Sequence, residues 1–427
     1  MDEEKKLGIL IQGCGARKHS LALRLSREDA VAKVVVVPGN AGIKGPKLLK
    51  VLDEKLLDPA NGFKDLLSWA TNMKFGLVIP GDQKYVLDRL GELFIKAGIQ
   101  WFGPSRKAAT IASCPIEANL FMQKYNIPTA ECGIYTDYGS SQLCLNDLPE
   151  NLEYADCNIE RSLRDDMIIN GLPSMAITMT GLSKTTSGES YLKEICVPPT
   201  KRAAHEFARK ILVTDGSIFY SFRPVITFNR NLECSSVLGD QGCVTWGQGL
   251  DEFQKEIDFK ILRPTVDDMP YIGFLSTDIV LTKNGPRALG YSAHFSSAAA
   301  QAVLPLLDTS LASTMKACID GRQSDIAWKW VAKTSVMVSI SATTEGEEIR
   351  VPKPLKANHG VYYEQNVIGV PRPNNPTKIM GLKTSPGGVL GVCAVAETME
   401  QAHAAAYELV EQMDFAGIVY ESDVGNW

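Results

Sequence analysis

The chain has 427 residues, of which 45% are apolar and 22% are charged, and its formal net charge is −5. At roughly 150 residues per domain this length predicts about two to four domains, and the apolar content favours packed cores over disorder. Nucleic-acid binding needs a clustered excess of Lys and Arg, which this mildly acidic chain lacks. We therefore expect no nucleic-acid partner.

Ten cysteines are few for a disulfide scaffold of this length, and no Cys-x-x-Cys pair is present to form a zinc site. The charged N-terminal residues 1–6 are not followed by a signal peptide or by about 18 consecutive apolar residues. The sequence therefore predicts a cytoplasmic protein with no membrane contact and no bound metal.

The N-terminal part alternates short apolar strands with helices. Apolar runs separated by glycine-rich turns and helices are typical of a parallel sheet, which binds its ligands at the carboxyl ends of the strands. The expected strands are Leu7–Gln12, Val34–Val37, Phe75–Ile79 and Ile99–Phe102, and the expected helices are Ser20–Leu25 and Tyr85–Ala97.

The rest of the chain mixes helices with further strands. Lys283–Pro286 is a hairpin turn signal between strands at Asp278–Thr282 and Arg287–Tyr291. The stretch 136–200 is polar and irregular, with weak strand signals. The other expected elements are a helix within 106–135, strand patterns over Ile211–Val225 and Val266–Leu281, helices at Ala298–Leu307 and Leu311–Gly321, a strand at Ser335–Ser341 and an amphipathic helix at Met399–Met413.

Motifs along almost the whole chain resemble, in the same order, the glycinamide ribonucleotide synthetase (phosphoribosylamine–glycine ligase) family of the ATP-grasp superfamily. The resemblance is weakest over 136–200. The matching segments are Gly13–His19, Pro38–Gly42, Phe102–Ser105, Asn126–Ala130, Tyr271–Leu275, Ser385–Cys393 and Asp423–Gly425.

The resemblance implies an α/β protein with the ATP-grasp fold, an N-terminal doubly wound parallel-sheet domain and a small C-terminal α+β domain. It also implies a reaction in which ATP phosphorylates the glycine carboxylate and phosphoribosylamine then attacks, with magnesium held by oxygen ligands. The implied domains are an N-terminal domain at 1–108, a central core at 109–135 and 201–334, a divergent lid at 136–200 and a C-terminal domain at 335–427.

The strand that carries the metal ligands in this family departs from its pattern here. The family pattern is roughly E-F-N-x-R-F-G-D-P-E, and its counterpart is 290–299. Gly290 stands for the carboxylate ligand, Ser292 for the amide ligand and His294 for the arginine that holds the glycine carboxylate. A glycine and one hydroxyl cannot hold a hard divalent cation.

Other elements that bind the nucleotide in this family also differ from the family pattern here. Cys114-Pro115 stands where the family has a phosphate-binding lysine, and the family's GPNTGGMG loop corresponds to 242–249, with Val244 and Trp246 at altered positions. These departures predict a degenerate ATP and magnesium site and no cofactor.

The N-terminal turns are less altered, and Gly13, Gly15 and Asn40 retain backbone shapes suited to an anion. The candidate catalytic residues are His294 and Arg230. The candidate substrate-binding residues are Trp246, Tyr291, Ser292, Thr245, Gly13, Gly15 and Asn40.

Four of the candidates have a structural alternative. His294 is either a cleft residue or a satisfied structural histidine. Trp246 and Tyr291 either form an apolar floor for a ligand or fill space left by ATP. Arg230 either meets an anionic substrate or pairs with a nearby acid.

We expect from these departures a repurposed enzyme. It would act on a small molecule in the former nucleotide and glycine cleft without ATP or metal, by isomerisation, cyclisation, addition or elimination, as in secondary metabolism. Two alternatives stay open: an active phosphoribosylamine–glycine ligase of purine biosynthesis, and a non-catalytic pseudoenzyme that acts as a binding module. The sequence gives no expectation for the oligomeric state.

Overall fold

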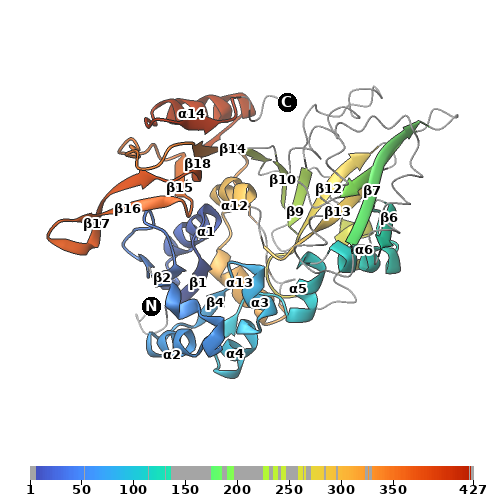
Figure 1. The fold of residues 1–427 in the computed structure, drawn as a ribbon, viewed down its shortest axis with the longest axis horizontal. Helices are drawn as coiled ribbons and strands as arrows, with labels where there is room; N and C mark the ends of the chain where they lie inside the picture. The colour runs from blue at the N-terminus through green and yellow to red at the C-terminus, as the bar shows by residue number, and fades with distance from the viewer. Residues whose placement is uncertain are drawn as a thin grey trace.

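A computed structural model of the chain describes seventeen stretches of residues, and Figure 1 shows them as coloured ribbons. They are 6–51, 53–113, 115–129, 131–135, 175–184, 190–196, 225–229, 234–238, 242–246, 258–262, 264–265, 271–282, 285–294, 297–322, 326, 329–422 and 424.

The N-terminal part is a five-stranded parallel sheet in the order β3-β2-β1-β4-β5. Both of its faces are covered, which is why its strands are nearly continuous apolar runs. The predicted parallel-sheet domain is confirmed. Its strands are β1 (Leu7–Gly13), β2 (Val31–Pro38), β3 (Leu48–Lys50), β4 (Leu77–Ile79) and β5 (Gln100–Trp101). Its helices are α1 (Ala16–Ser26), α2 (Lys64–Asn72), α3 (Gln83–Leu87) and α4 (Leu90–Lys96).

Successive residues of β1 face opposite sides of this sheet, as the two-residue period of a strand requires. Ile9 and Ile11 join the core on the α1 side, together with Leu21 and Leu25 of that helix. Leu10 joins the opposite core, which contains aromatic and aliphatic side chains of the segment from 57 to 109.

The single helix expected over Tyr85–Ala97 is two helices, α3 and α4. The break falls at Arg89, whose φ of 66° is in the left-handed region that a continuous α-helix excludes. The expected helix after residue 106 is likewise divided, into α5 (Arg106–Ser113) and α6 (Pro115–Lys124). A proline has no N–H and is favoured in the first turn of a helix, so Pro115 suits the start of α6.

A second sheet has nine strands, in the order β13-β12-β9-β10-β11-β14-β18-β15, with β19 paired to β14. The expected hairpin of β12 and β13 is present and antiparallel. β11 pairs with β14. The sheet therefore contains strands from both sides of the boundary at residue 334 that was expected between the central core and the C-terminal domain. The strands are β9 (Val225–Asn229), β10 (Cys234–Leu238), β11 (Gly242–Trp246), β12 (Ser276–Thr282), β13 (Gly285–Ser292), β14 (Thr334–Ala342), β15 (His359–Tyr363), β18 (Gly387–Ala396) and β19 (Ile418–Tyr420).

Three further strands form a small antiparallel sheet: β6 (Glu131–Tyr135), β7 (Met175–Lys184) and β8 (Ser190–Cys196). β7 and β8 lie within the stretch whose strand signals are weak in the sequence. The strand pattern over Ile211–Val225 falls almost wholly outside the described residues.

The helices of the C-terminal half connect the two large sheets. α12 (Ser297–Val303) packs against α1 on one side and against β11 and β14 on the other, and α14 (Met399–Glu411) covers β14 and β18. The expected helix over Ala298–Leu307 ends early, because Pro305 converts its last part into a short 3₁₀ turn. α13 (Leu311–Ile319) follows, and β16 (Val367–Arg372) and β17 (Asn375–Thr384) form a hairpin that projects from the molecule (Figure 1).

Within the stretches described above, no helix has the length and apolar character needed to span a bilayer.

Candidate functional site

The site is built on the turn between β1 and α1. Gly13 ends β1 at a φ of 120°, a backbone conformation that favours glycine. A Cβ at Gly13 would also collide with the side chain of Lys18, which folds back over the turn. The local sequence therefore brings the first turn of α1, with Arg17 and Lys18, to the carboxyl end of β1.

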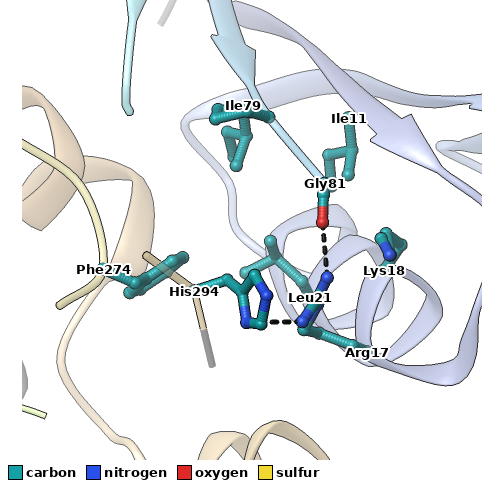
Figure 2. A pocket seen from close by; sticks show the side chains of 9 residues that line it. Ile11, Arg17, Lys18, Leu21, Ile79, Gly81, Phe274 and His294 are labelled. Atoms are coloured by element: carbon teal, nitrogen blue, oxygen red, sulfur yellow. Dashed lines mark hydrogen bonds between the residues drawn. The ribbon is translucent and has the colours of Figure 1, made fainter. Parts of the chain in front are cut away.

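Arg17 connects this turn to a distant part of the chain. Its Nη1 lies 2.7 Å from Nδ1 of His294, and its Nη2 donates a hydrogen bond to the carbonyl oxygen of Gly81 (Figure 2). Arginine has no acceptor, so Nδ1 of His294 accepts this bond and the ring proton lies on Nε2. The contact joins the parallel-sheet part of the chain to the residues that follow β13.

Asp82 balances the two cations of the site. Its Oδ1 accepts a hydrogen bond from Nζ of Lys18 at 2.8 Å and lies 3.5 Å from Nη2 of Arg17. The Arg17 and Lys18 side chains are only 14% and 11% exposed, against 47% for Asp82. Burial lowers the pKa of both basic groups, and the Asp82 carboxylate opposes this effect.

Gln12 positions the loop that carries Asp82. Its Oε1 accepts hydrogen bonds from the backbone N–H groups of Gly81, at 2.9 Å, and Asp82, at 3.2 Å. A Cβ at Gly81 would collide with the backbone carbonyl of Gln12, so the two backbone segments lie too close together for any residue larger than glycine at position 81. Sequence reasoning missed Gln12, although a buried glutamine at the end of an apolar strand is a signal for such a role.

A small cavity lies between α1, β4 and the residues around His294 (Figure 2). Its volume is about 20 Å³, which is room for about one water molecule. Arg17, Lys18 and His294 give it hydrogen-bonding groups, and Ile79 and Phe274 contribute apolar walls. The arrangement can hold one small polar or anionic group.

Asn40 ties three segments together. Its Nδ2 donates to the backbone oxygens of Cys14 and of Tyr363, the latter at 2.8 Å, and its Oδ1 accepts from the N–H of Gly42 at 3.0 Å. Asn40 is buried, and its amide bridges the two glycine-containing turns and the end of β15. Its predicted contact with substrate stays a prediction.

His19 forms a second connection between α1 and β15. Its Nδ1 accepts the backbone N–H of Tyr363 at 3.0 Å, and the two rings stack with centroids 5.7 Å apart. Complete burial lowers the pKa of His19 to about 3. The imidazole is therefore neutral near pH 7 and serves as an acceptor.

Glu364 lies directly at the N-terminus of α1. Its Oε2 accepts the backbone N–H of Ala16, and its Oε1 accepts the hydroxyl of Ser297, both at 2.9 Å. Sequence reasoning missed this residue, because 348 positions separate it from Ala16 and no local motif marks it.

The other predicted site residues are more dispersed. Tyr291 lies in a buried cluster, where its hydroxyl is 2.8 Å from Oγ1 of Thr265 and its ring meets Phe121 edge to face. Burial raises the pKa of Tyr291 to about 12. Ser292 is half-buried at the end of β13.

Two further candidates, Thr245 and Trp246, are placed only by their backbones. They lie at the end of β11, opposite Ser335 and Thr334 of β14. Arg230 lies outside the described residues. The structure thus brings together Gly13, Gly15, Asn40 and His294, and it places Tyr291 in a separate core.

Among the residues that the structure describes, no group of three or more His, Cys, Asp or Glu side chains could hold a metal ion. β13 ends with Gly290, Tyr291 and Ser292, none of which carries a carboxylate. The described residues therefore do not fit a magnesium ion.

The comparisons with known proteins agree with the fold. Residues 7–112 match the family model "Phosphoribosylglycinamide synthetase, N domain". The phosphoribosylamine–glycine ligase structure from Thermotoga maritima superposes with a TM-score of 0.63 at 17% identity, covering 98% of this chain and 100% of that one. The biotin carboxylase domain of a thermophilic 2-oxoglutarate carboxylase superposes with a TM-score of 0.61 at 11% identity, covering 97% and 92%.

Curated relatives align over nearly the whole chain. The Pichia angusta bifunctional purine biosynthetic protein is 27% identical over 99% of this chain, and the Caldanaerobacter subterraneus phosphoribosylamine–glycine ligase is 26% identical over 97% of it. The chain spans 54% of the first relative and 99% of the second.

The chain has the α/β fold that glycinamide ribonucleotide synthetase shares with the ATP-grasp biotin carboxylases. Along nearly its whole length, its sequence is similar to those of phosphoribosylamine–glycine ligases, at 25–26% identity. The resemblance inferred from the sequence motifs and the fold class that it implied are both confirmed.

The expectation of a repurposed enzyme acting without ATP or metal is contradicted. The relatives aligned along the chain are phosphoribosylamine–glycine ligases and purine biosynthetic proteins, and nothing in the comparisons points to an ATP-independent activity. That expectation gave too much weight to local departures such as Gly290 and Ser292, whereas the similarity extends over nearly every segment of the fold.

Proposed function

We propose that the chain is a phosphoribosylamine–glycine ligase, which joins phosphoribosylamine to glycine in purine biosynthesis. The observation that carries this proposal is the alignment with the Caldanaerobacter subterraneus ligase, which covers 97% of this chain and 99% of the relative. The proposed ligand is a small molecule bound where α1 meets the residues after β13, and the proposed compartment is the cytoplasm. We propose no nucleic-acid partner and no membrane partner.

The contacts of Arg17 and Lys18 support this proposal. A guanidinium matches the oxygens of a phosphate or a carboxylate in a forked geometry, and a buried ammonium adds a second charge. Nε2–H of His294 adds a neutral donor beside them. These groups would bind and orient an anionic part of a substrate. Because the described residues do not fit a divalent cation, we assign no step to a metal.

A non-catalytic homologue that binds substrate without turnover is the second candidate. The observation that favours it is the presence of Gly290 and Ser292 on β13, at positions where the motif resemblance implies metal ligands. A degenerate nucleotide site is part of this second proposal.

A bacterial strain that lacks phosphoribosylamine–glycine ligase and requires purine tests the two candidates. Expression of this chain is expected to restore growth without purine, and an immunoblot confirms that the protein is present. Arg17→Met is the matched variant, expected to reduce growth at equal protein level. Absence of growth despite soluble expression would favour the non-catalytic homologue.

A further inference from the structure

The carboxylate of Glu364 lies at the N-terminus of α1. The N-terminus of an α-helix presents unpaired N–H groups and a partial positive charge. α1 has 11 residues, its N-cap is Gly15 without a side-chain cap, and its first turn contains no acid. Glu364 supplies the missing negative charge from the far end of β15, through the N–H of Ala16.

The carboxylate lies directly over the turn. A Cβ at Gly15 would be 2.7 Å from Oε2 of Glu364, so the missing side chain of glycine makes room for this group. Ser297, at the start of α12, holds the second oxygen. The Glu364 side chain is therefore fixed by two partners from different segments.

Glu364 also borders a cavity of about 250 Å³ between β14, β15 and β18. The polar groups that line it come from Ser339, Glu364, Gln365 and Asn366. All of its lining residues belong to the described part of the chain, and Glu364 is the only charged one among them. A phosphate entering this cavity would meet a fixed carboxylate, and like charges placed together at a binding site repel each other.

We propose that Glu364 is an internal carboxylate ligand of α1 that excludes phosphates and other anions from this cavity. The cavity is thereby restricted to neutral or cationic ligands that donate hydrogen bonds, such as hydroxyl or amine compounds. This inference stands on the contacts of Glu364 and does not rest on the ligase proposal.

Titration calorimetry with inorganic phosphate tests the proposal on the wild-type chain, Glu364→Ala and Glu364→Gln. Glu364→Ala is expected to gain a phosphate-binding event that the wild type lacks, because it removes the only charged side chain among the described residues that line the cavity. Glu364→Gln keeps the shape and an oxygen acceptor, so its gain is expected to be smaller. Glu411→Ala, which removes an exposed carboxylate on α14, is the control for net charge and is expected to titrate like the wild type.

Identical phosphate titrations for the wild type and both Glu364 variants would overturn the proposal, as would an equal gain in Glu411→Ala. Circular dichroism establishes that each variant is folded, and Glu364→Gln decides the question if Glu364→Ala does not fold. Ligase activity is measured separately, so a failure of this proposal leaves the ligase proposal standing, and the reverse also holds.

Discussion

Nη1 of Arg17 lies 2.7 Å from Nδ1 of His294, across 277 positions of sequence. The contact joins α1 of the parallel-sheet part to the segment after β13. Two features that the sequence suggested separately, the glycine-rich turn after β1 and the cleft residue His294, are therefore in direct contact through Arg17.

This contact predicts energetic coupling between the two residues. Arg17→Met and His294→Ala are each expected to lower the free energy of unfolding by about 1–2 kcal/mol, because a partly buried hydrogen-bonding group loses one of its partners. Urea denaturation of the double variant is expected to show a loss smaller than the sum by about 0.5 kcal/mol or more. Arg17→Met combined with the distant Glu411→Ala serves as the control and should be additive. Additivity in both pairs would contradict the coupling.

Glu28 is predicted to anchor α13 to α1. Its two carboxylate oxygens accept the backbone N–H groups of Leu311 and Ala312, and Oε1 also pairs with Arg24 at 2.7 Å. Glu28→Ala removes a helix cap and leaves a largely buried guanidinium without its carboxylate. We expect a loss of about 2–4 kcal/mol in the free energy of unfolding.

Glu397→Ala is the matched control, because Glu397 forms an exposed ion pair with Lys333. It is expected to cost about 0–1 kcal/mol in the same denaturation experiment. Equal losses in the two variants would refute the anchoring role of Glu28.

The lowered pKa of His19 predicts that the free energy of unfolding falls as the pH is lowered below 6.5. Its pKa is lowered to about 3 in the folded chain from 6.5, so between these values the unfolded chain binds the proton and the folded chain does not. The contribution of His19 is complete above pH 6.5 and is lost as the pH falls towards 3, by about 1.4 kcal/mol per pH unit.

His19→Asn keeps a side-chain acceptor for the N–H of Tyr363 but does not titrate. Its free energy of unfolding, measured between pH 4 and pH 6, is expected to change with pH less steeply than that of the wild type by the equivalent of about one proton. Parallel curves would show that His19 is not the titrating group.

Tyr291 is predicted to contribute to stability through its hydroxyl. That hydroxyl is 2.8 Å from Oγ1 of buried Thr265, while the ring packs in the cluster around Met122 and Leu275. Tyr291→Phe is expected to lower the free energy of unfolding by about 1 kcal/mol and to leave the KM of any ligase activity unchanged. A raised KM with unchanged stability would instead assign Tyr291 to substrate binding.

The parallel sheet and the hairpin of β12 and β13 could be predicted from the sequence, because strand periodicity and turn residues are local signals. The prediction of one continuous helix over Tyr85–Ala97 was wrong, because the left-handed backbone conformation of Arg89 divides it and no glycine occupies that position to signal the break. Long-range polar contacts also escaped prediction. Glu364 caps α1 from 348 positions away, and only the packing of β15 against α1 brings them together.

Direct measurement of glycinamide ribonucleotide formation tests the central claim most directly. Purified chain is incubated with freshly prepared phosphoribosylamine, glycine, ATP and magnesium, and the product is quantified by mass spectrometry. The ligase proposal predicts product that depends on both glycine and ATP and that decreases in Arg17→Met. No product from folded protein, under conditions where a phosphoribosylamine–glycine ligase turns over, would contradict it.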